Sequence, residues 1–269
     1  MVELQKNEKE LADSVMGKIN LSKDKENLES HVVNLSKCVI DLSKKNNVDL
    51  GATKARVVVV LDYSGSMRRL YDTGEVQKAL HKLIPLGLTF DDNGSIDVYL
   101  FQDTYKKLSD MTLENYDNYI KGVVNKSGYS MGGTMYAPVL KAIAYGNNTD
   151  KKKGLFGKLF GGKSKESDSE PMVGNTQPTF VLFITDGDNF DAPETTELIK
   201  KISKENMFIQ FIGIGGASFS FLEQLDNLEG REVDNTGFSR MDSLVTASDN
   251  ELYNNVLSQF AEWLRVTQG

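Results

Sequence analysis

The chain is poor in the two residues on which disulfides and imidazole catalysis depend. Its 269 residues include one cysteine, Cys38, and two histidines, His31 and His81. A single cysteine cannot form an intrachain disulfide, so nothing in the sequence requires an oxidising compartment. No histidine follows residue 81, which excludes an α/β-hydrolase triad for every later serine, because that triad runs Ser, then Asp or Glu, then His.

Long apolar runs and an excess of basic residues are also absent. No stretch approaches the roughly 18 apolar residues of a membrane span, and the opening MVELQKNEKELADS lacks the apolar region of a signal peptide. Acidic residues outnumber basic ones by 38 to 31, for a net charge of −7. This balance is unlike the basic surface of a nucleic-acid binder. We therefore expect a cytoplasmic protein that attracts cations or basic partners and binds no nucleic acid.

Apolar runs rich in β-branched residues alternate with helical patterns along the chain. The runs predict strands buried on both faces of a parallel sheet. They cover residues 56–61, 96–101, 179–185 and 207–214. The helical patterns cover residues 75–87, 112–125, 136–146, 194–205 and 218–228, and a capping box at Ser248–Glu251 opens a last helix. This alternation predicts an α/β fold with a doubly wound, mostly parallel central sheet flanked by helices.

Residues 1–50 are predicted to form an N-terminal helical extension of a main domain at 51–269. Their apolar positions have the 4-3-4-3 spacing of an amphipathic helix that packs on that domain. These positions are Leu28, Val32, Leu35, Val39 and Leu42. A repeated Leu-Ser-Lys triplet leaves short β arms as the alternative. His31 and Cys38 lie in this stretch without a second His or Cys nearby in sequence, so we expect ordinary surface and core residues, not a metal site.

Residues 148–177 interrupt the main domain with a segment rich in lysine, glycine and serine. The segment lacks apolar periodicity, which predicts a flexible insertion between a helix and a strand. The alternative is that KKKGLFGKLFGGK, at 151–163, is a basic, apolar contact peptide. Contact with a membrane is then expected at most through this insertion.

The stretch GYSMGG at 128–133 matches G-x-S-x-G, the nucleophile elbow of α/β-hydrolases. Ser130 would be the nucleophile of such an enzyme. Both histidines precede it, and the approach VVNKSGYS is a poor strand-to-elbow transition. We therefore interpret the match to the elbow as a coincidence.

A second pattern follows the first predicted strand, where Asp62, Ser64 and Ser66 alternate with other residues. Alternation turns the three oxygen-bearing side chains toward one point beyond the carboxyl edge of the sheet, where open α/β sheets bind ligands. Thr134 opens another helix after two glycines, and Asp186 follows the strand at 179–185. Carboxylate and hydroxyl oxygens suit a hard divalent cation such as Mg²⁺. Helix capping by Asp62 and the serines is the alternative.

These five positions resemble the metal-ion-dependent adhesion site of von Willebrand factor type A (VWA) domains, over residues 55–269. The resemblance implies a Rossmann-like VWA fold and one bound divalent cation, Mg²⁺ foremost, with Mn²⁺ or Ca²⁺ as alternatives. It implies that Ser64, Ser66 and Thr134 bind the metal directly, and that Asp62 and Asp186 bind it directly or through water. A protein partner would supply an Asp or Glu to the open coordination position.

Within that family the sequence resembles the cytoplasmic bacterial branch associated with tellurium resistance and stress, which is distantly similar to copines. We expect a protein-interaction module and not an enzyme. The alternative is a metal-assisted phosphatase or hydrolase, since haloacid-dehalogenase phosphatases also place an aspartate after their first strand. Those enzymes follow D-x-D, whereas Ser64 stands at the second acidic position here.

Residues beside the five positions are predicted to shape the contact with a partner. Tyr63, Met67 and Tyr129 flank the loops and are expected to form an apolar rim. Asp188 and Asp191 follow Asp186 closely, so an acidic surround is expected to deter anions other than the partner carboxylate.

Overall fold

A single six-stranded sheet organises the part of the chain that the computed structural model describes, residues 2–17, 25–146, 177–187 and 189–268. Its order is β3-β2-β1-β4-β5-β6, and all neighbouring strands are parallel except the antiparallel pair β2 and β3. The strands are β1 (Arg56–Asp62), β2 (Asp97–Phe101), β3 (Tyr105–Lys107), β4 (Thr179–Thr185), β5 (Met207–Ile214) and β6 (Thr236–Met241). This mostly parallel sheet with flanking helices is the Rossmann-like VWA fold that the sequence predicts.

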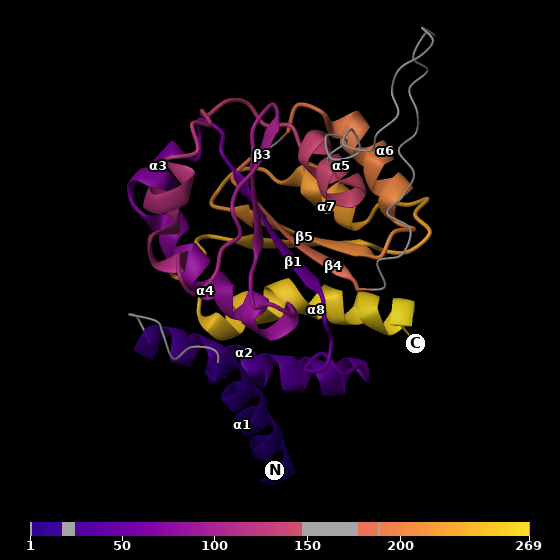
Figure 1. The fold of residues 1–269 in the computed structure, drawn as a ribbon. Helices are drawn as coiled ribbons and strands as arrows, with labels where there is room; N and C mark the ends of the chain where they lie inside the picture. The colour runs from indigo at the N-terminus through magenta and orange to yellow at the C-terminus, as the bar shows by residue number, and fades with distance from the viewer. Residues whose placement is uncertain (1, 18–24, 147–176, 188, 269) are drawn as a thin grey trace, which may run out of the picture.

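Helices cover both faces of the sheet (Figure 1). One face carries α5 (Ala137–Tyr145), α6 (Ala192–Ile202) and α7 (Ser220–Asp226). The other carries α4 (Glu75–Phe90) and α8 (Asp249–Gln268), with α2 (Lys25–Asn46) and α1 (Val2–Met16) packed outside α8. The short α3 (Arg68–Asp72) follows β1. None of the helices in the described ranges is long and apolar enough to cross a membrane.

β1 shows why the apolar runs form central strands. Val57, Val59 and Leu61 pack into the core beneath α4 and α8, whereas Val58 and Val60 pack into the core beneath α5 and α6. A strand buried on both faces needs apolar residues at every position, which is why the run lacks a polar alternation. β1 also separates β2 from β4, so the strand order reverses on its two sides. Open α/β sheets bind ligands in the crevice at such a switch point.

Most of the predicted elements are present, with small differences at their ends. β4 and β5 have the predicted bounds, β1 continues to Asp62 and β2 begins at Asp97. The predicted last helix is α8, whose cap is the bond from the Glu251 N–H to the Ser248 hydroxyl at 3.2 Å. The sequence analysis did not anticipate α1, α3, β3 and β6. These four lack a long periodic pattern, and the outer strands depend on the sheet edge for their pairing.

The predicted helix over 112–125 is wrong. The segment instead forms a 3₁₀ turn, η1 (Tyr116–Asn118), and a π turn, η2 (Ile120–Val124). The side-chain amide of Gln77 donates to the Tyr116 carbonyl at 2.6 Å and accepts from the Ile120 N–H at 2.9 Å. Those two backbone groups would bond each other in an α-helix. The amide from α4 therefore replaces the helical hydrogen bond, and tertiary contact overrides local periodicity.

The N-terminal segment is helical, so the alternative of short β arms is wrong where the structure describes it. All five residues of its apolar stripe are at most 3% exposed, in the same core cluster as β1 and α8. Cys38 is buried in that cluster, as expected. Residues 147–176 lie outside the described residues, so the flexible insertion at 148–177 stays a prediction.

Removing one side chain of this stripe is expected to destabilise the whole protein. Leu35 is fully buried, so Leu35→Ala should lower the free energy of unfolding by about 2–5 kcal/mol through lost burial and a cavity. Val33 lies two residues earlier at 37% exposure, and Val33→Ala should change that free energy by less than about 0.5 kcal/mol. Urea denaturation measures both. An unchanged value for Leu35→Ala would show that α2 is a dispensable appendage.

Candidate metal centre

The candidate centre is built around the carboxyl ends of β1 and β4, which are paired strands. Leu61 is in register with Ile184, so Asp62 and Thr185 end their strands side by side. The carboxylate of Asp62 is buried, and its Oδ2 accepts a hydrogen bond from Thr185 Oγ1 at 2.6 Å. Its Oδ1 accepts one from the Ser64 N–H at 2.8 Å. Asp62 is thus fixed by hydrogen bonds from the end of β4 and from the loop after β1.

Two serines connect this carboxylate to Asp186. The hydroxyls of Ser64 and Ser66 lie 3.0 Å apart, and the Ser66 hydroxyl donates to Asp186 Oδ1 at 2.8 Å. Asp62, Ser64, Ser66 and Asp186 therefore form one chain of hydrogen bonds across the switch point. Four of the five predicted ligands lie together.

Thr134, the fifth, is delivered by a loop that pairs with the β1 loop. Ser64 and Gly132 form an isolated parallel bridge, in which the Gly65 N–H donates to the Gly132 carbonyl at 3.2 Å. On the other side, the Thr134 carbonyl accepts from the Phe190 N–H at 2.9 Å. Thr134 is 8% exposed and lies between the loop after β1 and the loop after β4.

Asp103, which the sequence analysis missed, braces the Thr134 loop. Its Oδ2 accepts from the Gly133 N–H at 3.0 Å, and a Cβ at Gly133 would lie 2.2 Å from its Oδ1. The Gly133 backbone and the Asp103 carboxylate therefore approach closely, and a side chain at Gly133 would displace that carboxylate. Two consecutive glycines in the sequence signal such an approach, but they do not identify the partner in the β2–β3 loop.

Electrostatics at this edge favour a cation. Burial raises the pKa of Asp62 to about 6, with nearby Asp186 adding to the rise and hydrogen bonds from Ser64 and Thr185 opposing it. Burial also raises the pKa of Asp186, against its bond from Ser66. Neither carboxylate is ion-paired with a Lys or Arg of the described chain. A divalent cation would supply the missing positive charge, and hydroxyls can turn their lone pairs toward it. The residues fit the implied metal.

Two residues expected around the site have other positions. Met67 is 1% exposed and belongs to the core, so its assignment to the apolar rim is wrong. Asp191 is 5% exposed, and its carboxylate accepts from the N–H groups of Tyr136 at 3.0 Å and Ala137 at 2.8 Å. It therefore caps α5 and is not part of an exposed acidic surround. Asp188 lies outside the described residues.

An exposed aromatic residue that the sequence analysis missed follows Asp186, in addition to the two tyrosines expected to form the apolar rim. Tyr63 and Tyr129 stack with ring centroids 6.1 Å apart and remain partly exposed, as expected of a rim. Phe190 follows in the loop after Asp186 and is 80% exposed. Its signal in the sequence is a lone aromatic within the polar stretch GDNFDA.

Ser130 is hydrogen-bonded to neither histidine among the described residues. It is exposed in the loop before Thr134. Neither imidazole is hydrogen-bonded to Ser130, because His31 is bonded to Asp249 and the ring of His81 packs on Tyr116. This agrees with reading the elbow match as a coincidence.

Comparison with known proteins points to one family. A family model described as vWA-TerF-like, a vWA domain found in the TerF C terminus, matches residues 54–160 and 165–269. Uncharacterized protein YcbR of Bacillus subtilis (strain 168) is 32% identical over 234 residues, which cover 84% of this chain and 86% of that protein. Copine-E of Dictyostelium discoideum is 33% identical over 88 residues, or 32% of this chain and 15% of that protein.

Solved structures show more distant similarity. Proximal thread matrix protein 1 of the mussel byssus, in crystal form 2, has a TM-score of 0.48 at 20% identity. A structure of that protein with a zinc-occupied MIDAS motif has a TM-score of 0.47 at 19% identity, and both cover 78% of this chain and 47% of theirs. The ArnB paralog VWA2 of Sulfolobus acidocaldarius has a TM-score of 0.39 at 15% identity and covers 77% of this chain and 45% of its own. This chain thus spans about half the length of these structures.

The capping role of Asp191 predicts a loss of stability when its carboxylate is removed. Asp191→Ala leaves the N–H groups of Tyr136, just before α5, and Ala137, its first residue, without this partner, so the free energy of unfolding should fall by about 1–3 kcal/mol. Glu194→Ala, at an exposed position in the first turn of α6, should change it by less than about 0.5 kcal/mol. Chemical denaturation compares the two variants, and equal small effects would rule out the capping role.

Proposed function

The chain belongs to the TerF-like family of von Willebrand factor type A domains, and from that premise we propose that it is a metal-dependent protein-interaction module. The observation that carries the proposal is the buried Asp62 carboxylate at the switch point, joined through two serines to Asp186, with no basic partner among the residues that the structure describes. Such a donor set is short of positive charge and rich in oxygen, which is what a hard divalent cation requires.

Mg²⁺ is the proposed ion, with Mn²⁺ or Ca²⁺ as alternatives. Ser64, Ser66 and Thr134 would hold it through their hydroxyls. Both oxygens of Asp62 already accept hydrogen bonds within the protein, so this carboxylate would act through bound water, and Asp186 would act directly or through water. When bound, the ion offers an open coordination position to an incoming carboxylate.

A protein partner is proposed to fill that position with an aspartate or glutamate. Tyr63, Tyr129 and the exposed Phe190 lie on the loops that carry the metal-site residues and would supply an apolar contact area for the rest of the partner. Aromatic side chains beside a polar centre are the usual composition of a binding surface. By analogy with its family, the protein would serve a bacterial stress or tellurium-resistance system.

We propose no catalysis at this site. Within the described residues no imidazole or ammonium group is hydrogen-bonded to the five metal-site side chains. The second acidic position of the phosphatase pattern is Ser64, whose hydroxyl cannot act as the general acid that a carboxyl supplies. Metal-dependent hydrolysis of a generic phosphate ester that disappears in Asp62→Ala would favour a phosphatase instead.

Loss of hydroxyl ligands is expected to weaken metal binding without unfolding the protein. Titration calorimetry with Mn²⁺ should give one site for the unmodified chain, and a Ser64→Ala, Ser66→Ala double variant should bind at least about tenfold more weakly, since each lost charged-group contact costs about 1.5 kcal/mol or more. Ser130→Ala, in the neighbouring loop, is the matched control and should bind normally. Unchanged affinity in the double variant would refute the ligand assignment.

Partner binding is expected to require the metal and Thr134 together. Immobilised protein should capture a partner from a host lysate with Mg²⁺, and both chelator and Thr134→Ala should abolish capture, because the carboxylate bridge needs the ion. Circular dichroism should show that Thr134→Ala retains its fold. Capture that survives in chelator and in Thr134→Ala would place the partner elsewhere, for instance on the exposed side of α2.

A further inference from the structure

A buried tyrosine, Tyr136, lies next to the candidate metal centre, one residue before α5. Its side chain is fully buried, and its ring packs edge-on against Phe101 and Phe183, with centroids 5.6 and 4.7 Å apart. It also stacks on Phe211 at 6.3 Å. Close packing against three rings holds the side chain in one orientation. The core therefore fixes the position of its hydroxyl.

The Tyr136 hydroxyl holds the chain at the residue directly after Asp186. It lies 2.7 Å from the Gly187 carbonyl and 3.3 Å from Thr185 Oγ1. The Thr185 hydroxyl has one proton and donates it to Asp62 Oδ2 at 2.6 Å. The Tyr136 hydroxyl also has one proton, and the shorter distance assigns it to the Gly187 carbonyl. The ring is thus linked to the end of β4 and to the loop that begins with Asp186.

Three hydrogen bonds join the segment of Thr134 to the loop after β4, and the hydroxyl makes one of them. The Tyr136 N–H donates to Asp191 Oδ1 at 3.0 Å, and the Phe190 N–H donates to the Thr134 carbonyl at 2.9 Å. The hydroxyl bond is the one of the three made closest in sequence to Asp186. These bonds together set how far Thr134 lies from Asp186.

The packing of the Tyr136 ring does not depend on the hydroxyl, because a phenylalanine would make the same ring contacts. A hydroxyl buried without a hydrogen bond costs free energy, so its partners account for its presence here. Both partners adjoin predicted metal-site residues, since Gly187 follows Asp186 and Thr185 is bonded to Asp62. The hydroxyl is therefore placed to act on the metal centre.

The spacing and rigidity of the ligands decide which divalent ion a site prefers. Mg²⁺ holds oxygen ligands at about 2.0–2.1 Å and demands near-octahedral geometry. Ca²⁺ accepts longer distances of about 2.3–2.6 Å and irregular arrangements. Ligands held at a fixed spacing can therefore favour Mg²⁺, whereas ligands on a loosened loop adapt more readily to Ca²⁺.

We propose that the Tyr136 hydroxyl is a positioning group that holds Asp186 at the spacing from Thr134 that Mg²⁺ requires, and that it thereby favours Mg²⁺ over Ca²⁺. This inference rests on the metal-binding function proposed above. Tyr136 does not contact the ion. It acts on Asp186 through the Gly187 carbonyl, so the ion binds to a loop that is already in place.

Tyr136→Phe tests the proposal, because it removes the hydroxyl and keeps the ring. Titration calorimetry with Mg²⁺ should show binding about fivefold weaker or more, the loss that corresponds to one hydrogen bond. Binding of Ca²⁺, titrated separately, should weaken by less than about twofold, because Ca²⁺ tolerates the loosened loop. The ratio of the two affinities is a measure that a general loss of stability would not change.

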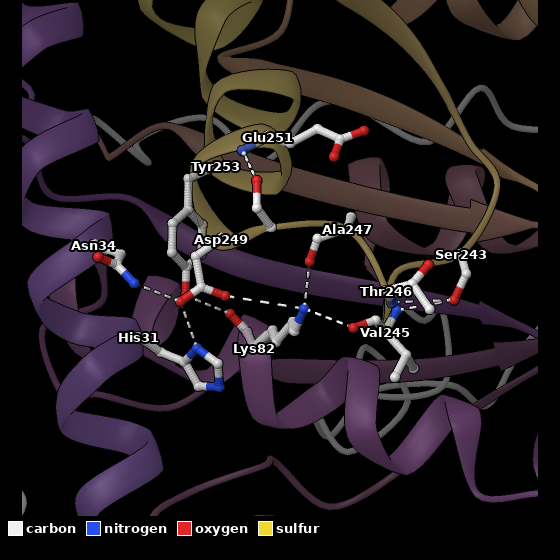
Figure 2. A network of polar contacts seen from close by, with 11 residues as sticks. His31, Asn34, Lys82, Ser243, Val245, Thr246, Ala247, Asp249, Glu251 and Tyr253 are labelled. Atoms are coloured by element: carbon white, nitrogen blue, oxygen red, sulfur yellow. Dashed lines mark hydrogen bonds and ion pairs between the residues drawn. The ribbon is translucent and has the colours of Figure 1, made fainter.

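Tyr253→Phe is the matched control. Tyr253 is also fully buried, and its hydroxyl donates to the Lys82 carbonyl at 2.9 Å. Figure 2 shows this hydroxyl in the polar network between α2, α4 and α8. Each variant loses one buried hydrogen bond to a backbone carbonyl, so the melting temperatures in EDTA should fall by similar amounts. Tyr253→Phe should bind both ions normally.

Hydrogen exchange in EDTA gives a readout that needs no metal. The Phe190 amide is bonded to Thr134, across the same junction that the Tyr136 hydroxyl holds. This amide should exchange faster in Tyr136→Phe than in the unmodified chain, because the loop opens more often. Tyr253→Phe should leave its exchange rate unchanged.

The outcomes distinguish this inference from the proposed function. A selective loss of Mg²⁺ affinity and faster Phe190 exchange, both confined to Tyr136→Phe, support the positioning role. Equal losses for Mg²⁺ and Ca²⁺, equal effects in the two tyrosine variants, or no effect in Tyr136→Phe overturn it while metal binding by the unmodified chain stands. A Tyr136→Phe chain that does not fold also overturns it, since the fold itself would then need the hydroxyl. An unmodified chain that binds neither ion refutes the proposed function and this inference with it.

Discussion

The parallel pairing of β1 with β4 is the constraint on which the rest of the structure depends. It is the point where the strand order reverses, and its register brings the end of β1 beside the end of β4. Asp62 is buried there only because Thr185 and the Ser64 N–H satisfy its two oxygens, and because the Tyr71 hydroxyl donates to its carbonyl at 3.0 Å. Burying a carboxylate without such hydrogen-bond donors would cost more free energy than the fold can offset.

The carboxylates of Asp62 and Asp249 show how the surroundings of a buried acid decide what it does. Burial raises the pKa of Asp62, and no cationic side chain of the described ranges offsets the rise. Burial acts in the same direction on Asp249, but hydrogen bonds from His31 and Asn34, with the charges of His31 and Lys82, outweigh it and lower that pKa. Asp249 therefore has its positive partners within the chain and serves to hold α2, α4 and α8 together. Asp62 has no such partner in the part of the chain that the structure describes, which is why a bound cation suits it.

Loop positions around the candidate metal centre are held by side chains from distant elements. Asp103 braces the glycine loop from β2–β3, and Asp191 begins α6 through its backbone while its carboxylate caps α5. Thr134 consequently sits on a loop tied at both ends, and the exposed Phe190 is bonded to its carbonyl. A site of this kind is pre-organised by its surroundings, so a ligand does not have to order the loops itself.

The sequence by itself determined the α/β class, the four central strands and the set of oxygen donors. Apolar runs such as 179–185 and 207–214 place apolar side chains on both faces of a strand. Such a strand is buried whichever helices cover the sheet, so it can be predicted from its own residues. The spacing of Asp62, Ser64 and Ser66 is likewise local, since β1 ends at Asp62 and the two serines lie in the short loop that follows it. Local patterns of this kind can be predicted because each residue's neighbours in sequence decide the outcome.

Only the tertiary structure decided which distant side chains form hydrogen bonds with backbone groups outside the strands. Gln77 replaces a helical bond within 112–125, and Asp191 leaves the expected acidic surround to cap α5. The two histidines meet in one cavity because α2 and α4 pack together, which no spacing along the chain reveals. In each case the partner is tens of residues away, and its identity follows from the packing of whole elements.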